Sequence, residues 1–308
     1  MRGAIETREL ITVNVDGMRL RGTYHKSHGQ GSDSRPERHE SNRIGILFLN
    51  SGFVPRASAG DAAVYWADSF AECGYPSFRF DLPGLGDSDG DLPEKLLEFA
   101  GLVNAGYYAP FVAGIARDLT ERFHLSGVVL AGHCAGAVSA IFSAAASEYV
   151  RGLVGLEAYF FREGPERTNV RKEISLLVAR SKLVAQLSRV YGLLRKFASS
   201  LKRNPLPQNA NLPLIRCCSR LVCSGMPILI LNATEPRPNP SEFDYLSYLQ
   251  RLSGRDGQLA VKFVEGTNHS FADDVGRTAV RRHIEQWLSS YFPLIESVRI
   301  AAVLSGTR

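Results

Sequence analysis

The chain has 308 residues, of which 44% are hydrophobic and 22% charged, and its net charge is +5. This balance is typical of a globular protein with a large core and excludes collagen-like and highly charged disordered chains. No stretch approaches about 18 consecutive apolar residues, and residues 1–6 lack the apolar region of a signal peptide, so we expect no membrane span. An odd number of cysteines, five, predicts a reducing, cytoplasmic location rather than a disulfide framework.

Strands and helices alternate along most of the chain, after an N-terminal hairpin. The hairpin is predicted over Leu10–Val15 and Met18–His25, because Asp16-Gly17 between two strand patterns is a strong turn signal. Residues 27–42, rich in serine and glycine, predict a polar loop. The other predicted strands cover residues 44–50, 75–80, 127–131, 150–157, 226–231 and 259–264, and the predicted helices 60–73, 107–123, 241–252 and 275–291. This alternation predicts an α/β fold with a doubly wound, mostly parallel sheet.

Residues 158–222 interrupt the alternation with amphipathic helical patterns, so we expect a helical cap inserted after the sixth strand. The core then comprises residues 1–157 and 223–292, and residues 293–308 form a C-terminal tail. Between residues 158 and 220, thirteen basic residues stand against three acidic ones, a net charge of +10, which leaves −5 for the rest of the chain. No nucleic-acid motif accompanies these charges, so we expect no nucleic-acid partner and favour solvated helix faces.

The segment from Val128 to Ala137 carries the strongest chemical signal. It predicts a strand, then the pattern Gly132-His133-Cys134-Ala135-Gly136, then an alanine-rich helix. In a strand–turn–helix context, Gly-x-Ser-x-Gly marks a nucleophile elbow, and here a thiol stands at the nucleophile position. The glycines leave no Cβ to clash in the tight turn, and the N-terminus of the helix favours a thiolate. We therefore expect Cys134 to be a reactive nucleophile rather than a buried apolar cysteine.

A cysteine nucleophile needs a base that accepts its proton and a carboxylate that orients the base. His269 follows the last predicted strand at the carboxyl edge of the sheet, and it is the expected general base. Two acids follow strands at the same edge. Glu235, after the strand 226–231, is the favoured acid, and Glu157, at the end of the preceding strand, is the alternative.

Tetrahedral chemistry at a carbonyl also needs an oxyanion hole. The backbone N–H of Ala135, directly after the nucleophile, is one expected donor, and the N–H of Phe53, after the strand 44–50, is the other. Gly52 allows that loop to turn close to the site. The residues expected to bind substrate are Asn50, Arg56, His133 and Tyr159.

The elbow is one of four motifs in a recognisable order, namely Asn50-Ser51-Gly52-Phe53, Asp81-Leu82-Pro83-Gly84-Leu85-Gly86-Asp87-Ser88, Gly132-His133-Cys134-Ala135-Gly136 and Asn268-His269-Ser270. With these motifs the chain resembles the α/β-hydrolase superfamily over nearly its full length. It departs from that superfamily in having cysteine for the usual serine and Glu235 for the commoner aspartate. More narrowly, it resembles bacterial hydrolases encoded near exosortase and exopolysaccharide systems, which carry Gly-x-Cys-x-Gly and an Asn-x-Gly loop followed by arginine. The resemblance implies the α/β-hydrolase fold.

Two functions are consistent with these residues. The first is acyl transfer through a Cys134 thioester, acting on thioesters, esters or lactones, with water or another acceptor completing the reaction. We expect a small acyl substrate, either as a free molecule or attached to an acyl carrier protein or coenzyme A. We expect no metal or other cofactor. The alternative is a non-catalytic ligand-binding protein on an α/β-hydrolase scaffold, because fold does not fix function.

Overall fold

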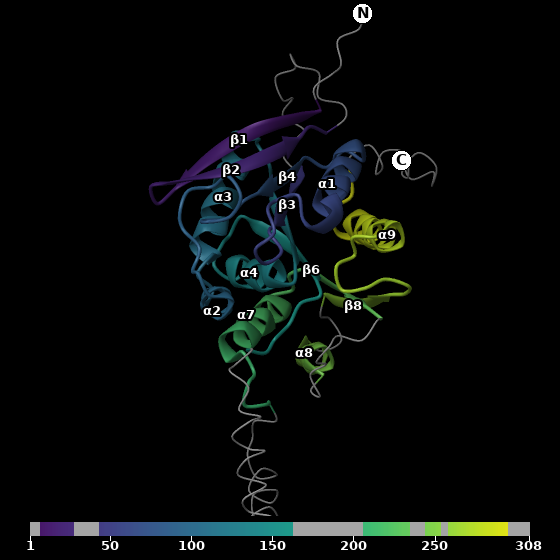
Figure 1. Ribbon diagram of the computed structural model, residues 1–308. Coiled ribbons are helices and arrows are strands. Elements are labelled where there is room, and N and C mark those ends of the chain that lie inside the picture. Colours follow the sequence, from purple (N-terminus) through teal and green to yellow (C-terminus); the bar gives the residue numbers. More distant parts are fainter. Residues whose placement is uncertain (1–6, 28–42, 163–205, 235–243, 254–257, 295–308) are drawn as a thin grey trace, which may run out of the picture. The chain divides into compact units, whose positions relative to one another are not determined.

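One mixed sheet organises this protein, which we describe from a computed structural model (Figure 1). The structure describes residues 7–27, 43–162, 206–234, 244–253 and 258–294. In these residues the strands are β1 (Arg8–Val15), β2 (Met18–His25), β3 (Ile44–Leu49), β4 (Ser77–Phe80), β5 (Gly127–His133), β6 (Val150–Leu156), β7 (Ile228–Ala233) and β8 (Leu259–Val264). Their order across the sheet is β1-β2-β4-β3-β5-β6-β7-β8.

The two ends of the sheet differ in strand direction. β1 and β2 form the predicted antiparallel hairpin, in which Val15 pairs with Met18 and both Asp16 and Gly17 have positive φ angles. β2 is also antiparallel to β4, whereas all pairs from β4 to β8 are parallel. The carboxyl ends of six strands therefore meet at one edge, where ligands bind in open α/β sheets. This confirms the predicted doubly wound sheet.

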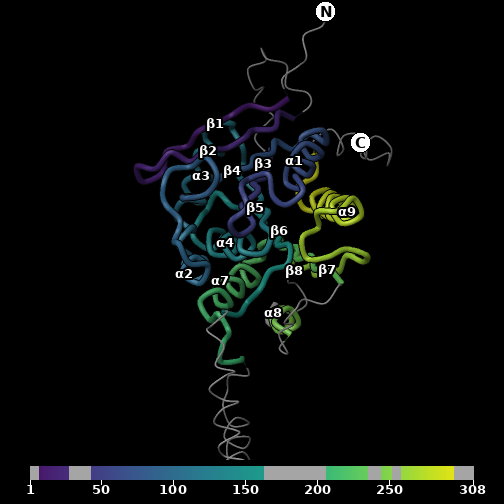
Figure 2. Tube along the Cα trace, in the orientation of Figure 1, coloured from purple at the N-terminus to yellow at the C-terminus, as the bar shows by residue number. Residues whose placement is uncertain are grey.

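Helices cover both faces of the sheet. On one face lie α1 (Ala62–Glu72), after the short 3₁₀ turn Ala59–Asp61, and α9 (Asp274–Tyr291), which contact each other; Figure 2 shows them side by side. On the other side lie α2 (Leu96–Ala105), α3 (Ala109–Arg122), α4 (Ala135–Ala144), α7 (Leu212–Cys223) and α8 (Tyr245–Ser253). α4 is at the centre of this second layer, because α2, α3 and α7 all pack against it.

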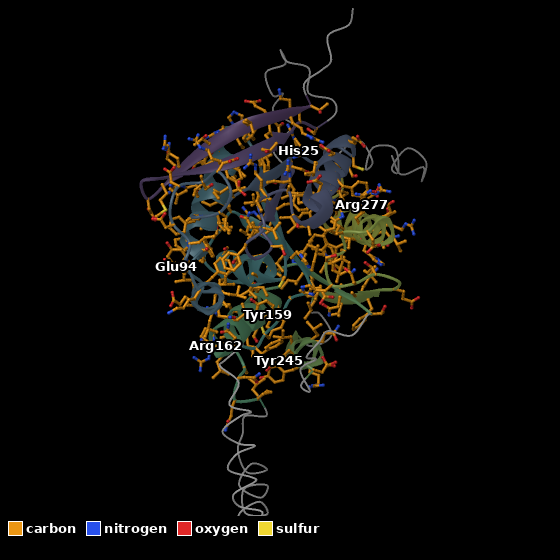
Figure 3. All side chains as sticks on the ribbon, in the orientation of Figure 1. His25, Glu94, Tyr159, Arg162, Tyr245 and Arg277 are labelled. Carbon is orange, nitrogen blue, oxygen red and sulfur yellow. The ribbon has the colours of Figure 1, made fainter. Side chains whose placement is uncertain are left out.

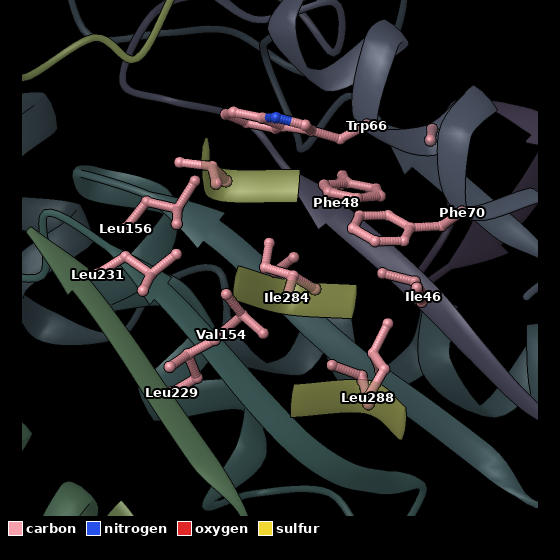
Figure 4. Packing of buried hydrophobic residues seen from close by; sticks show 14 of the residues in the cluster. Ile46, Phe48, Trp66, Phe70, Val154, Leu156, Leu229, Leu231, Ile284 and Leu288 are labelled. Atoms are coloured by element: carbon pink, nitrogen blue, oxygen red, sulfur yellow. The ribbon is translucent and has the colours of Figure 1, made fainter. Parts of the chain in front are cut away.

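The larger described core cluster lies between the sheet and the α1–α9 layer (Figure 4). β3 is buried along its whole length, as its continuous apolar sequence predicts for a central strand. Phe48 lies 6.4 Å from Trp66 and 6.3 Å from Phe70 between ring centroids, which fixes α1 on the sheet. Trp66 also donates a hydrogen bond from Nε1 to the Arg277 carbonyl (2.9 Å), and this bond ties α1 to α9. Arg277 is labelled in Figure 3. Full burial of each aromatic side chain contributes about 1.5–3 kcal/mol.

The predicted cap over residues 158–222 stays a prediction. The chain divides by its contacts into residues 1–160 with 212–308, and residues 161–211, so α7, which packs on α4 and α8, falls in the first unit. The amphipathic pattern of residues 212–222 therefore arises from a core helix that precedes β7. Within the separate unit, Phe161 forms an isolated bridge with Ala210. The predicted helical content of residues 163–205, the loop 28–42 and the end of the tail (295–308) lie outside the described residues.

Candidate functional site

Cys134 lies at the turn between β5 and α4, with a φ of 54° and a ψ of −114°. Such a backbone is strained for a residue with a side chain and is found mainly at functional sites. The neighbouring glycines have a steric reason. A Cβ on Gly132 would lie 2.3 Å from the Gly136 backbone, and one on Gly136 would lie 2.4 Å from the Asn50 carbonyl oxygen. Both positions therefore need glycine for β5, α4 and the loop after β3 to approach each other closely.

The two predicted oxyanion-hole donors are the backbone N–H groups of Ala135 and Phe53. Ala135 is the first residue of α4, so its N–H has no partner within the helix. Phe53 lies in a tight turn closed by the hydrogen bond from Val54 N–H to the Ser51 carbonyl (3.1 Å), with Gly52 at a φ of 59°. Among the described residues, neither the Ala135 nor the Phe53 N–H donates a hydrogen bond. Both are available to a ligand oxygen.

His269 lies between β8 and α9, at the same edge of the sheet as Cys134. Its Nδ1–H donates to Glu157 Oε2 at 3.1 Å, which leaves Nε2 for the thiol. Hydrogen bonding with the Cys134 side chain, and next with Glu157, raises the pKa of His269 from 6.5 to about 9, against the opposing effect of burial. Both partners therefore make His269 a stronger base, as a group that accepts the thiol proton requires.

Glu157 directly follows β6 and is only 2% exposed, whereas the His269 side chain is 44% exposed. Its φ is 54°, and its own N–H donates to the Leu231 carbonyl at 2.8 Å. Oε1 accepts a hydrogen bond from the Ala233 N–H and Oε2 one from His269, so the buried carboxylate is well satisfied. The favoured acid of the sequence analysis, Glu235, lies outside the described residues, and the alternative, Glu157, contacts the histidine.

Asn50 and Arg56, both predicted to bind substrate, are hydrogen bonded to other residues of the protein. The Asn50 amide nitrogen donates to the Val54 carbonyl (3.1 Å) and to Asp81 Oδ1 (3.0 Å), and its oxygen accepts from the Leu82 N–H (2.8 Å). Arg56 pairs with Asp81 and Asp87. These bonds shape the loop that carries Phe53. Sequence reasoning missed Asp81 as their common partner, although its place at the carboxyl end of β4 was a usable signal.

His133, the third expected substrate contact, is also buried and joins two loops of the site. Its Nε2 lies 2.7 Å from the His269 carbonyl oxygen, so Nε2 carries the proton and donates it. Nδ1 then accepts a hydrogen bond from the Ser51 hydroxyl at 2.8 Å. The His133 ring lies 5.0 Å from the His269 ring between centroids. His133 therefore connects the loop before Phe53 to the loop of His269, while Tyr159 is half-buried two residues after Glu157.

The described residues contain no group of three histidine, cysteine or acidic side chains placed to hold a metal ion. In the same part of the chain, no single helix has the length and apolar character to cross a bilayer. The pair α2 and α3, bent by 60° at their junction, meets that requirement only when taken together.

Comparisons with known proteins agree with this fold. A sequence model of the alpha/beta hydrolase family matches residues 46–282. Among solved structures, TT1662 from Thermus thermophilus is similar with 17% identity and a TM-score of 0.57, over 91% of this chain and 98% of the other. The alpha/beta hydrolase GrgF from Penicillium sp. sh18 has 15% identity, a TM-score of 0.57 and coverages of 93% and 99%. Epoxide hydrolase VrEH1 from Vigna radiata has 16% identity, a TM-score of 0.52 and coverages of 94% and 100%. None of the curated protein sequences compared with the chain matches it.

Proposed function

Because this chain belongs to the alpha/beta hydrolase family, we propose that it is an acyl-transfer enzyme that works through a covalent thioester on Cys134. One observation carries the proposal: a strained cysteine at the elbow, a histidine whose pKa the cysteine side chain raises, and a buried carboxylate bonded to that histidine. In the proposed triad Cys134 is the nucleophile, His269 the base and Glu157 the acid that orients it.

The first half-reaction forms the thioester. The Cys134 thiol proton moves to His269 Nε2, and the sulfur attacks the carbonyl carbon of the substrate. The C–S bond forms while the carbonyl π electrons move to oxygen. The bond to the leaving group then breaks, and that group takes the proton from Nε2. Water or another nucleophile next attacks the thioester, passes its proton to Nε2 and releases Cys134 as the thiol, so atoms and charge balance over the cycle.

The oxyanion formed in both half-reactions is stabilised by the N–H groups of Phe53 and Ala135. Their lack of partners among the described residues supports this role. Removing one such donor typically costs about 10²- to 10³-fold in turnover. Since the bonds of Asn50 and His133 hold the Phe53 loop and the His269 loop, these two residues position the machinery rather than bind substrate.

The substrate class follows from the nucleophile. A thioester on cysteine forms readily from activated acyl groups, that is, thioesters or strained lactones, and can pass its acyl group to water or to another acceptor. An acyl group on coenzyme A or on an acyl carrier protein is the proposed natural form. Both carriers are anionic and would be attracted by the basic segment between residues 158 and 220. In that case kcat/KM for an acyl-coenzyme A falls as ionic strength rises; a flat salt response would remove this partner from the proposal.

Intact-mass spectrometry after mixing with short acyl thioesters tests the covalent step. The wild-type protein should gain the mass of one acyl group, and the Cys134→Ala variant should gain none. Cys223→Ala is the matched control, because Cys223 is an exposed thiol far along the chain from the elbow and its loss should leave the adduct unchanged. An adduct that persists in Cys134→Ala, or that never forms in the wild type, would favour the non-catalytic alternative.

A further inference from the structure

An apolar surface begins at the loop of Phe53 and continues over α2. Phe53 is 41% exposed, and Leu96 and Leu97 in the first turn of α2 are 67% and 53% exposed. Tyr107, just after α2, is exposed as well. Single exposed apolar side chains need no explanation, but a group of them marks a binding surface. We call the residues Phe53, Leu96, Leu97, Phe99 and Tyr107 the Phe53 face.

Aromatic contacts join Phe53, Phe99 and Tyr107 of this face through Tyr108. The Phe53 ring stacks on Phe99 of α2 with 4.2 Å between centroids, and Phe99 lies 6.1 Å from Tyr108. Tyr107 lies 5.1 Å from Tyr108, so the series runs from the loop after β3 to the start of α3. Phe99 is buried, and the exposed Phe53 ring stacks on it.

α2 is held firmly against the elbow helix. Gly106 ends α2 with a φ of 78°, and a Cβ at this position would lie 3.0 Å from the Phe142 ring of α4. The chain enters α2 just after Glu94, which Figure 3 labels. The Phe53 face is therefore carried by elements that pack directly on the helix bearing the proposed nucleophile.

We propose that the Phe53 face binds the hydrocarbon chain of the acyl substrate, so that the enzyme selects medium and long acyl chains over short ones. The inference rests on the proposed function, since it takes the position of the substrate carbonyl from the Phe53 N–H. The N–H and the ring belong to one residue. An acyl chain attached to a carbonyl at that N–H therefore reaches the ring within a few methylenes and then continues over α2.

The expected selectivity for chain length follows from the apolar area of the acyl chain that the Phe53 face covers. Complete burial of a methylene corresponds to about fourfold in binding, and contact on one side only leaves roughly twofold. The methylenes between a butanoyl and a decanoyl chain therefore give roughly 60-fold in kcat/KM at twofold each. A site without such a surface gives no dependence on chain length.

A series of straight-chain acyl-coenzyme A substrates tests the inference. In the wild type, kcat/KM should rise steadily from acetyl to decanoyl. In Leu96→Ser/Leu97→Ser the rise should largely disappear, and the variant should still fold because both leucines are exposed and neither supports the core. Leu10→Ser is the matched control, since Leu10 is an exposed leucine on β1 and its loss should leave the rise unchanged.

Binding to Cys134→Ala, measured by calorimetry, separates this inference from the proposed chemistry. Tighter binding of decanoyl- than butanoyl-coenzyme A, lost in Leu96→Ser/Leu97→Ser, supports the acyl surface even if the wild type forms no covalent adduct. Equal binding of both chains, together with a normal acetyl adduct, overturns the inference and leaves the proposed function standing. Concentration-dependent dimerisation abolished by the two serines, with no chain-length effect, would assign the face to a second copy of the chain and likewise overturn it.

Discussion

Glu157 occupies a position that few carboxylates tolerate, because it is almost fully buried and has a left-handed backbone. Both its oxygens accept hydrogen bonds, one of them from His269. Glu157→Gln should therefore lower kcat by about 10³- to 10⁴-fold, as expected when a base loses the anion that fixes its tautomer. Glu235→Gln, measured beside it, should change kcat little. A large loss in Glu235→Gln with a small one in Glu157→Gln would reverse the assignment of the acid.

His269 offers a measurement that does not depend on finding the substrate. Its pKa of about 9 owes most to hydrogen bonding with the Cys134 side chain. Cys134→Ala removes the largest cause of the raised pKa, so the pKa of His269 should fall in this variant. Proton NMR titration of the ring, assigned against His269→Gln, gives the value, and Cys223→Ala should leave it unchanged. The same high value in Cys134→Ala would mean that the Cys134 side chain does not raise the pKa of His269.

His133 acts on the site through two hydrogen bonds rather than through substrate. His133→Phe retains a ring but loses the bonds to Ser51 and to the His269 carbonyl, so the His269 loop should shift. Small displacements of a reacting group can cost about 10²-fold in rate. We expect a loss of that order in kcat, little change in KM and an altered pH profile for alkylation of Cys134. Ser51→Ala removes one of the two bonds and should have a smaller effect; unchanged kcat and alkylation in His133→Phe would refute the positioning role.

At the scale of elements, the elbow depends on the close approach of β5, α4 and the loop after β3. Gly132→Ala would place a Cβ 2.3 Å from the Gly136 backbone, which cannot move without displacing α4. We expect a strong fall in the midpoint of thermal unfolding and loss of Cys134 reactivity. Gly101→Ala, in α2, is the matched control, because nothing lies within 4 Å of the added carbon. It should stabilise the protein by up to about 1 kcal/mol. Equal unfolding midpoints for the two variants would contradict this account of the elbow.

The elbow could be predicted from sequence because its constraints are local. Gly132, Cys134 and Gly136 stand at a fixed spacing between a buried strand and a buried helix, and the spacing alone specifies the turn. The narrower resemblance to exosortase-associated hydrolases is carried by few residues and stays a prediction. α2 was not predicted, since residues 96–105 follow a loop rich in aspartate and proline and are apolar on several sides rather than on one stripe.

The parts of the site that the sequence could not predict depend on contacts between residues far apart in the chain. Glu157 and Glu235 both follow a strand at the same edge, so periodicity cannot say which reaches His269 across 112 residues of sequence. The choice depends on the backbone angle of Glu157 and on its contact with the Ala233 N–H, neither of which has a sequence pattern. Asn50 and Arg56 likewise have a partner, Asp81, that follows a different strand, β4, and no sequence pattern shows this contact.

At the scale of the whole molecule, a buried polar cluster around His25 connects the antiparallel end of the sheet to its parallel part. His25 of β2 lies between Asp68 of α1 and Arg79 of β4 and is almost fully buried. Its Nδ1–H donates to Asp68 Oδ1 (2.7 Å), and its Nε2 accepts from Arg79 Nε (2.9 Å). Arg79 in turn donates to the Arg56 carbonyl (3.1 Å), so the cluster reaches the loop that carries Phe53.

Burial lowers the pKa of His25 from 6.5 to about 4. Between these values the unfolded chain binds a proton at His25 that the folded protein does not, so acidification favours unfolding. The stabilisation by neutral His25 is complete above pH 6.5 and is lost as pH falls toward about 4. The difference corresponds to ~3 kcal/mol of unfolding free energy. A proton on Nε2 would also face the Arg79 guanidinium, which opposes protonation further.

Urea unfolding of the wild type between pH 6.5 and about 4 should therefore show a free energy of unfolding that declines as pH falls. His25→Asn keeps an N–H for Asp68 but does not titrate, so its decline should be shallower by about 1.4 kcal/mol per pH unit within the range. His283→Asn is the matched control, because His283 also has a lowered pKa but is less buried, and its loss should flatten the decline less. Parallel curves for the wild type and His25→Asn would show that the acid sensitivity of the fold arises elsewhere.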